Sequence, residues 1–206
     1  MRATVGFLLA FLGLPGAAAT QSASGTALFA HAGPSAPIGE LAHGWDPGYH
    51  LGGGASVPWG GARRLRFEVA YERLGVDASG RFEDFTGERP TEARALEGAH
   101  FSALTAMAGL EWRLMKLGGG ATPYLTAGLG YALLTYAGGA LLVDGERIVV
   151  EENRDSGLAG SVGMGVHVAT LERFGVFSEA RLVAGWPLDD EVHLSVPLRL
   201  GVSILP

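Results

Sequence analysis

The stretch from Val192 to Ile204 alternates between apolar residues and small or polar residues without a break. A side-chain period of two indicates a β-strand, because successive side chains point to opposite faces. The run is longer than the usual strand of about 5–6 residues. One face is wholly aliphatic, while the other carries His193, Ser195 and Arg199. A strand of about 9–11 residues with this pattern is typical of closed barrels in membranes, where the apolar face meets lipid and the polar face lines the lumen.

The same alternation recurs along the chain with differing clarity. Between Arg64 and Leu74, for example, Phe67 and Val69 flank Glu68. The sequence therefore predicts an all-β fold, an antiparallel up-and-down transmembrane β-barrel of eight strands. The predicted strands are Thr26–Ala32, whose facing the pattern leaves open, then Tyr49–Trp59, Arg64–Leu74, Ser102–Leu114, Pro123–Thr135, Leu158–Thr170, Val176–Trp186 and Val192–Ile204.

The first residues predict an export signal. Arg2 gives a positive start, Val5–Leu14 is an apolar run that a Pro-Gly pair ends, and Ala17–Ala19 is a small-residue cleavage site. This order is typical of a secretory signal peptide, and the apolar run is too short to span a membrane. We expect a signal peptide at residues 1–19 and an outer-membrane β-barrel domain at residues 20–206.

Composition narrows the class of protein further. No other segment has the ~18 unbroken apolar residues of a transmembrane helix, so an exported membrane protein of this sequence is expected to cross as a barrel. The chain has 33 glycines, and small inward residues suit a narrow lumen. It has no cysteine, which excludes disulfides and thiol chemistry. The net charge of −6 becomes more negative when Arg2 leaves with the signal peptide, so no nucleic-acid partner is expected.

The connections between the predicted strands alternate in length. Gly60–Arg63 and Glu172–Gly175 are short links, whereas Asp77–His100 and Gly138–Gly157 are long. This rhythm matches the periplasmic turns and extracellular loops of outer-membrane barrels. In the second long loop, the pair Asp144–Gly145 lies between apolar runs and predicts a hairpin, which we expect to project beyond the membrane. The alternative is that this hairpin adds two strands to the barrel, which gives ten.

Large aromatic residues lie near both ends of the predicted strands. Trp59 and Trp112 end strands that run toward the periplasm, and Tyr49, Tyr71 and Trp186 lie toward the opposite end. Two such belts are expected where amphipathic rings meet the two interfaces of a membrane. The alternative fold is a soluble secreted barrel of the lipocalin type, whose apolar side chains face inward.

Several short glycine-rich motifs resemble those of the bacterial outer-membrane β-barrel domain proteins. They are Ala32-Gly33-Pro34 with Pro37-Ile38-Gly39, Gly48-Tyr49 with Gly52-Gly53, Pro123–Gly130, Phe177–Arg181 and Val196–Gly201. The resemblance covers nearly all of the chain after the signal peptide. It implies a small outer-membrane barrel, usually of eight strands, and no particular activity. Such barrels usually end on an aromatic residue that the assembly machinery reads, whereas this sequence ends Ile204-Leu205-Pro206 and is expected to be recognised less efficiently.

Charged residues of both signs fall on the predicted inward faces. They are Arg66, Glu68, Glu72, Glu111, Arg113, Glu179, Arg181 and Arg199. The interior of an eight-stranded barrel is just wide enough for side chains, and an unpaired charge in a confined interior is costly. We therefore expect these residues to form a network of ion pairs that fills the lumen. The alternative is a gated ion pathway in which the pairs exchange partners.

The sequence offers little that points to catalysis. His193-Leu194-Ser195 resembles the His-x-Ser of outer-membrane lipid A deacylases, in which a carboxylate about a dozen residues later orients the base. Eleven residues follow Ser195 and none is acidic. The other histidines are scattered without the spacing of metal ligands, and the glycine runs lack the lysine of a phosphate loop. We expect no catalytic residue, cofactor or metal.

The sequence thus predicts an outer-membrane protein of structural, adhesive or surface-interaction type without catalytic activity. Its expected partners are outer-membrane lipid and the barrel assembly machinery, and the expected oligomeric state is a monomer. Trp45, Phe82, Phe85 and Val149 lie in predicted loops and are candidate contacts for an external partner. Two alternatives remain open, a narrow gated channel or transporter through the lumen and, with less support, a surface lipid-modifying enzyme.

Overall fold

A computed structural model describes residues 25–39, 41–79, 83, 90, 93–114, 117, 120–169, 171, 173–187 and 192–206. Its elements are β1 (Ala27–Ile38), α1 (Leu41–Gly44), β2 (Trp45–Pro58), β3 (Arg63–Val76), β4 (Ala93–Glu97), β5 (His100–Arg113), β6 (Ala121–Ala137), β7 (Gly139–Val143), β8 (Glu146–Val150), β9 (Asn153–Ala169), β10 (Phe174–Pro187) and β11 (His193–Ile204). Within these ranges, no helix is both long and apolar enough to cross a membrane. The predicted signal peptide lies outside the described residues.

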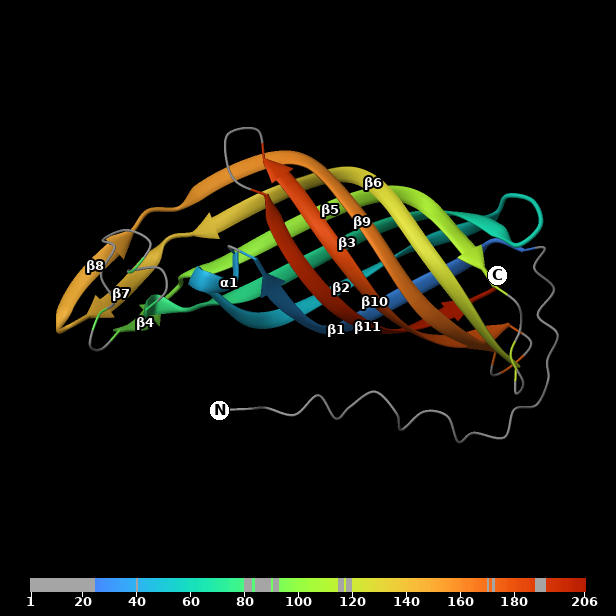
Figure 1. Cartoon of the computed structure of the whole chain (residues 1–206), viewed down its shortest axis with the longest axis horizontal. Coiled ribbons are helices and arrows are strands. Elements are labelled where there is room, and N and C mark those ends of the chain that lie inside the picture. Colours follow the sequence, from blue (N-terminus) through green and yellow to red (C-terminus); the bar gives the residue numbers. More distant parts are fainter. Residues whose placement is uncertain are drawn as a thin grey trace.

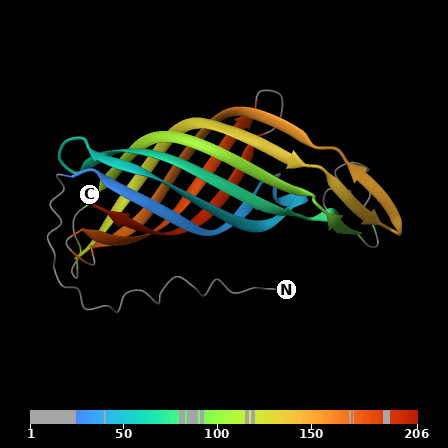
Figure 2. The same ribbon diagram turned by 180° about the vertical axis from the view of Figure 1, so that it is seen from behind.

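Eight of the strands close into an antiparallel barrel with the order β1-β11-β10-β9-β6-β5-β3-β2 (Figure 1). The seam that closes the barrel joins the first strand to the last, and it runs from Leu28 opposite Ile204 to Ile38 opposite Leu194. Seen from behind, the strands are strongly tilted against the long axis (Figure 2), as closure of a sheet into a barrel requires. The predicted eight-stranded up-and-down barrel is confirmed.

The alternation along each strand places the apolar side chains outside and the polar ones inside. Leu129 is 73% exposed and Leu158 is 67% exposed, whereas Arg199 is 3% exposed within the lumen. Because a lipocalin-type barrel turns its apolar side chains inward, this arrangement contradicts that alternative. The outward aliphatic and aromatic side chains form a continuous pattern around all eight strands.

Exposed aromatic rings mark both ends of the apolar surface. Trp59 and Trp112 are exposed at the end of the barrel that carries the β2–β3 turn, where Trp112 lies opposite Arg63. Tyr49 and Trp186 are exposed toward the opposite end of their strands. These positions match the two aromatic belts expected from the sequence.

A smaller sheet of three strands, with the order β4-β7-β8, is separate from the barrel. The β7–β8 hairpin turns at Asp144 and Gly145, whose φ angles are 47° and 86°. Positive φ at both central residues is what a tight two-residue hairpin turn requires. The predicted hairpin is therefore confirmed, and the ten-stranded alternative is wrong. The small sheet lies beyond the end of the barrel opposite the C-terminus (Figure 1).

The first strand is longer than the sequence pattern predicted. The prediction ended at Ala32, whereas β1 continues to Ile38. The alternation is obscured there by Gly33 and Pro34, for which no pairing with β11 is formed. A proline lacks the backbone N–H that donates hydrogen bonds between paired strands. Pro34 therefore interrupts the pairing with β11 without ending the strand. The register with β11 resumes unchanged at Ser35.

Candidate functional site

The middle of the lumen holds a group of charged side chains that we call the ion-pair cluster. It consists of Arg66 and Glu68 of β3, Glu179 and Arg181 of β10, and Arg199 of β11. The alternation of each strand turns these residues inward, and closure of the barrel places β3 across the lumen from β10 and β11. None of the five is more than 6% exposed.

Two carboxylates of the cluster are each shared by three arginines. Glu68 lies 2.6 Å from Arg199 and 3.2 Å from both Arg66 and Arg181. Glu179 lies 2.6 Å from Arg181, 2.8 Å from Arg66 and 3.4 Å from Arg199. Removing charges from water is costly unless they are paired and hydrogen-bonded. The shared contacts therefore fix the mutual positions of opposite walls of the barrel.

Two further side chains contact this cluster that the sequence analysis missed. The hydroxyl of Tyr124 in β6 donates to Glu179 Oε2 at 3.1 Å, and His31 Nε2 of β1 lies 3.5 Å from Glu68 Oε1. Neither residue is charged by default, so a search for charged inward positions passes over both. Both residues occupy alternate strand positions whose side chains face the lumen, and that alternation is the sequence signal that identifies them.

Glu111 and Arg113 of β5 form an ion pair at the edge of the cluster. Arg113 Nε donates to Glu111 Oε1 at 2.8 Å. Among the described residues, Glu111 reaches the cluster only through Arg66, whose NH1 lies 3.9 Å from Glu111 Oε2. Ion pairs thus connect seven of the eight predicted lumen charges.

Glu72, the eighth predicted residue, lies apart from these ion pairs. Its carboxylate accepts hydrogen bonds from the hydroxyl of Ser35 and, at 3.1 Å, from the hydroxyl of Ser195. No arginine, lysine or histidine side chain of the described residues lies within ion-pair distance of it. The alternation along the strand predicts that Glu72 faces the lumen. Which side chains lie at the same level along the barrel axis depends on the strand register, which the alternation does not give.

Arg64 is a lumen arginine that the sequence analysis did not include. It is 3% exposed and shares the inward face of β3 with Arg66. Its Nε donates to Ser56 Oγ at 2.7 Å, and its NH2 donates to the carbonyl oxygens of Gly25 and Ser56. Arg64 lies two residues before Arg66 and four before Glu68, so its side chain is expected on the same face of the strand. This spacing is the sequence signal that identifies it.

Toward the end that carries the small sheet, the lumen is filled by packed rings that we call the aromatic cluster, namely Trp45, Phe101, Tyr136 and His193. Ring centroids lie 5.6 Å apart for Trp45 and Phe101, 5.3 Å for Phe101 and Tyr136, and 5.6 Å for Tyr136 and His193. The fully buried Leu74 packs in the same core. These side chains pack against one another in this end of the lumen.

The aromatic cluster corrects the prediction for Trp45 and agrees with the prediction that His193 faces the lumen. Trp45 was expected in a loop as a contact for an external partner, but it is 6% exposed at the start of β2. Phe82 and Phe85 lie outside the described residues, and Val149 is 71% exposed in β8. His193 and Ser195 face the lumen as predicted: His193 contacts the hydroxyl of Tyr136, and Ser195 holds Glu72.

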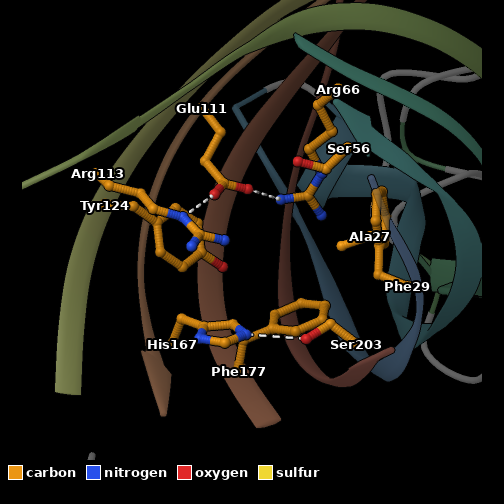
Figure 3. A pocket seen from close by; sticks show the side chains of 10 residues that line it. All are labelled: Ala27, Phe29, Ser56, Arg66, Glu111, Arg113, Tyr124, His167, Phe177 and Ser203. Carbon is orange, nitrogen blue, oxygen red and sulfur yellow. Dashed lines mark hydrogen bonds and ion pairs between the residues drawn. The ribbon is translucent and has the colours of Figure 1, made fainter. Parts of the chain in front are cut away.

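At the opposite end, near the described chain ends, the lumen opens into a pocket that we call the vestibule (Figure 3). The vestibule encloses about 330 Å³ of empty space, including the solvent at its mouth. It is lined by Ala27, Phe29, Ser56, Arg66, Glu111, Arg113, Tyr124, His167, Phe177 and Ser203. Because Arg66 belongs to the ion-pair cluster, that cluster forms the inner limit of the pocket.

The vestibule combines a Ser–His contact with charged and aromatic walls. His167 Nε2 and Ser203 Oγ lie 2.9 Å apart, and the guanidinium of Arg66 lies over the Phe29 ring at 4.2 Å. Among the described residues, no group of three or more His, Asp or Glu side chains is arranged to hold a metal ion. The walls of the vestibule thus present charged, hydrogen-bonding and aromatic groups side by side.

No family model and no curated protein sequence matches this chain. Among solved structures, Neisserial surface protein A is 18% identical with a TM-score of 0.60, and the match covers 89% of this chain and 98% of that one. The N-terminal β-barrel domain of Pseudomonas aeruginosa OprF is 14% identical with a TM-score of 0.47, covering 86% and 96%. Ail, the attachment invasion locus protein of Yersinia pestis, is 14% identical with a TM-score of 0.47, covering 88% and 98%. The likeness to Neisserial surface protein A shows that the chain has the fold of the small eight-stranded outer-membrane barrels.

Proposed function

We propose that this protein is a structural and surface-interaction protein of the bacterial outer membrane, without catalytic activity. The observation that carries the proposal is its inverted polarity, in which Leu129 and Leu158 face outward around a lumen filled with arginine and glutamate. This is the arrangement that a barrel needs in lipid. In water, the same surface would leave an apolar area far larger than soluble monomers expose.

The filled lumen supports the role of an anchor. The ion-pair cluster crosses the middle of the barrel, and the aromatic cluster fills the end beyond it. The likeness to a neisserial surface protein supports a surface role by analogy of fold alone. An anchor of this kind holds its outer loops in place and does not need a passage through its centre.

The small sheet is the part of the molecule that supports contact with a partner outside the cell. In outer-membrane barrels, short turns face the periplasm and longer connections face outward. By that rule, the β4-β7-β8 sheet stands on the extracellular side, beyond the barrel end (Figure 1). Val149 is 71% exposed there. Loops of this kind carry function more often than the strands that support them.

The remaining parts of the proposal follow from the sequence. A signal peptide at residues 1–19 directs export, and the barrel assembly machinery inserts the mature chain as a monomer. Outer-membrane lipid then covers the apolar surface. No nucleic acid is among the proposed partners, since the chain is acidic.

Cell fractionation tests the membrane assignment. The full-length chain is expressed in a Gram-negative host, and the envelope fractions are run on gels with and without boiling. We expect the protein in the outer-membrane fraction, with faster migration before boiling and a mass that matches cleavage after Ala19. Recovery from the soluble periplasm without a mobility shift contradicts the proposal.

Removal of the β7–β8 hairpin tests the surface role. Residues 139–150 are replaced by a short Asn-Gly turn, and adhesion of the expressing cells to surfaces coated with matrix proteins is measured. We expect the heat-dependent mobility shift to remain and adhesion to fall to that of cells without the protein. The matched control is Arg63→Gln, a change at the opposite end of the barrel, which should leave adhesion unchanged. Equal adhesion with and without the hairpin contradicts this role.

A gated ion pathway is the second candidate function. One observation favours it: each arginine of the ion-pair cluster has a second carboxylate at hand, so partners can be exchanged without leaving a charge unpaired. Conductance in planar bilayers separates the two functions. Discrete openings at any applied voltage favour the pathway, and a flat trace at all voltages favours the anchor.

A further inference from the structure

Arg113 presents an unused edge of its guanidinium to the vestibule. The only hydrogen bond or ion pair of this side chain to a described residue is the one from Nε to Glu111, and 21% of the side chain is exposed. Its terminal nitrogens therefore remain available on the pocket side (Figure 3). Two parallel N–H groups on one guanidinium edge match the two oxygens of a carboxylate.

Positive charge exceeds negative charge around this pocket. The ion-pair cluster at its inner limit holds three arginines and two glutamates, and the Arg113–Glu111 pair adds one of each. Arg64, on the same inward face, adds another guanidinium. A confined site of low dielectric with net positive charge concentrates small anions.

A buried nitrogen of Arg66, at the inner limit, also lacks a hydrogen-bond acceptor among the described residues. It is Nε, and Arg66 is 6% exposed and lines the pocket. Buried donors are nearly always paired in native proteins, with protein groups or with bound water. An anion with its water molecules supplies the acceptor that this donor needs.

The walls of the vestibule add a preference for a ligand with an apolar part. The rings of Phe29 and Phe177 meet edge to face with centroids 6.3 Å apart, and both line the pocket. A charged recess beside apolar walls fits an organic anion better than a strongly hydrated inorganic one.

We propose that the vestibule is a binding site for small aliphatic monocarboxylates. Arg113 holds the carboxylate with its free edge, Arg66 contributes positive charge from the inner limit, and the two phenylalanine rings contact the aliphatic chain. Glu111 opposes binding, because its charge lies on the other side of the same guanidinium. This site is at the opposite end of the barrel from the proposed adhesive surface, and it does not depend on that role.

Nuclear magnetic resonance of the full mature chain in detergent micelles tests the site. Sodium butyrate replaces sodium chloride stepwise at constant ionic strength, and the Nε–Hε signals of the arginines are followed. We expect saturable shifts for Arg113 and Arg66 and none for Arg63, which is exposed on the outside of the same end. Because chloride is the competing anion at every step before full replacement, a shift that saturates reports a preference of the site for the carboxylate over chloride. Shifts that grow linearly, or equal shifts at Arg63, overturn the proposal.

Two variants give opposite results if the proposal holds. Arg113→Gln should abolish the saturable shift of Arg66, whereas Glu111→Gln should lower the half-saturating butyrate concentration at least about tenfold, since a like charge close to the ligand is removed. Arg63→Gln is the control for charge alone and should change neither value. Folding of each variant is checked by its mobility shift on boiling. If Arg113→Gln does not fold, unchanged or weaker binding in Glu111→Gln is sufficient to overturn the proposal.

Discussion

The ion-pair cluster and the aromatic cluster fill the same lumen by different physical means. In the ion-pair cluster, Glu68 and Glu179 hold three arginines through contacts of 2.6–3.4 Å. In the aromatic cluster, the rings of Trp45, Phe101 and Tyr136 pack with centroids 5.3–6.0 Å apart around apolar neighbours. Both exclude open space from the barrel, and both join strands that are far apart in sequence.

The difference lies in how each cluster responds to loss of one member. Paired charges in a buried site gain little over apolar groups of the same volume, but loss of one partner leaves an uncompensated charge. An apolar cluster loses only the transfer free energy of the missing atoms and the contacts around the cavity. We therefore expect the ion-pair cluster to contribute mainly to the specificity of the strand arrangement, and the aromatic cluster to contribute mainly to net stability.

The largest expected effect is that of Glu179→Gln in the ion-pair cluster. It removes one of two carboxylates that serve Arg66, Arg181 and Arg199. We expect the free energy of unfolding, measured by urea titration in detergent micelles, to fall by about 3–5 kcal/mol. The double variant Glu179→Gln/Arg181→Met should recover part of this loss, because one unpaired charge is also removed. A loss below about 1 kcal/mol for the single variant would indicate that water screens the ion-pair cluster, so that the two clusters would not differ in their response to the loss of one member.

Leu74, which packs in the same core as the aromatic cluster, offers a matching test on the apolar side through Leu74→Ala. Leu74 is fully buried, and a cavity of this kind costs about 3 kcal/mol. The same urea titration measures the loss. Leu129→Ala, at a position that is 73% exposed on the outer face, is the control and should cost much less. Equal losses for the two leucines would mean that the lumen is not packed at Leu74.

A smaller effect is expected for Tyr124→Phe, which leaves the ring in place and removes one hydroxyl. This hydroxyl donates to Glu179 Oε2 at 3.1 Å, while two arginine contacts to Glu179 are shorter. We expect a loss of about 1–2 kcal/mol in the same unfolding experiment. An effect as large as that of Glu179→Gln would show that Tyr124 is an equal member of the ion-pair cluster.

The smallest effect is expected for Glu152→Gln outside the barrel. Arg154 and Glu152 lie 2.6 Å apart, the same separation as Arg199 and Glu68, but their side chains are 77% and 47% exposed. Water screens such a pair, so the unfolding free energy should change by less than about 0.5 kcal/mol. A larger change would mean that the strength of an ion pair depends more on the distance between its charges than on their burial. The buried ion-pair cluster would then have no special sensitivity to the loss of one partner.

The outward faces of the strands are well predicted from sequence, because a period of two is a local property. Strand β5 shows this clearly: Leu104 and Leu110 are exposed and Glu111 is buried, as the alternation predicts. Strand ends are predicted less well. Trp45 was assigned to a loop since the irregular pairing between Asp46 and Tyr49 disturbs the alternation at the start of β2.

The partners of the inward side chains depend on distance across the lumen and are not a local property. The alternation of side chains along each strand places Glu68, Glu72 and Arg199 in the lumen. It does not predict which of the two carboxylates forms an ion pair with Arg199. Strand register decides this: Glu68 lies 2.6 Å from Arg199, whereas Glu72 bonds to the hydroxyls of Ser35 and Ser195. Register follows from the whole set of strand pairings, which a single sequence specifies only weakly.

The seam between β1 and β11 has a consequence for how the chain reaches its native state. Its pairing of Leu28 with Ile204 encloses almost the whole domain in one loop, and pairings between distant residues form slowly. Until β11 arrives, β1 and β10 have unpaired edges that readily recruit strands of other chains. A chain that stalls before β11 is complete is therefore an aggregation hazard, and protection by a holding chaperone matters most during that interval.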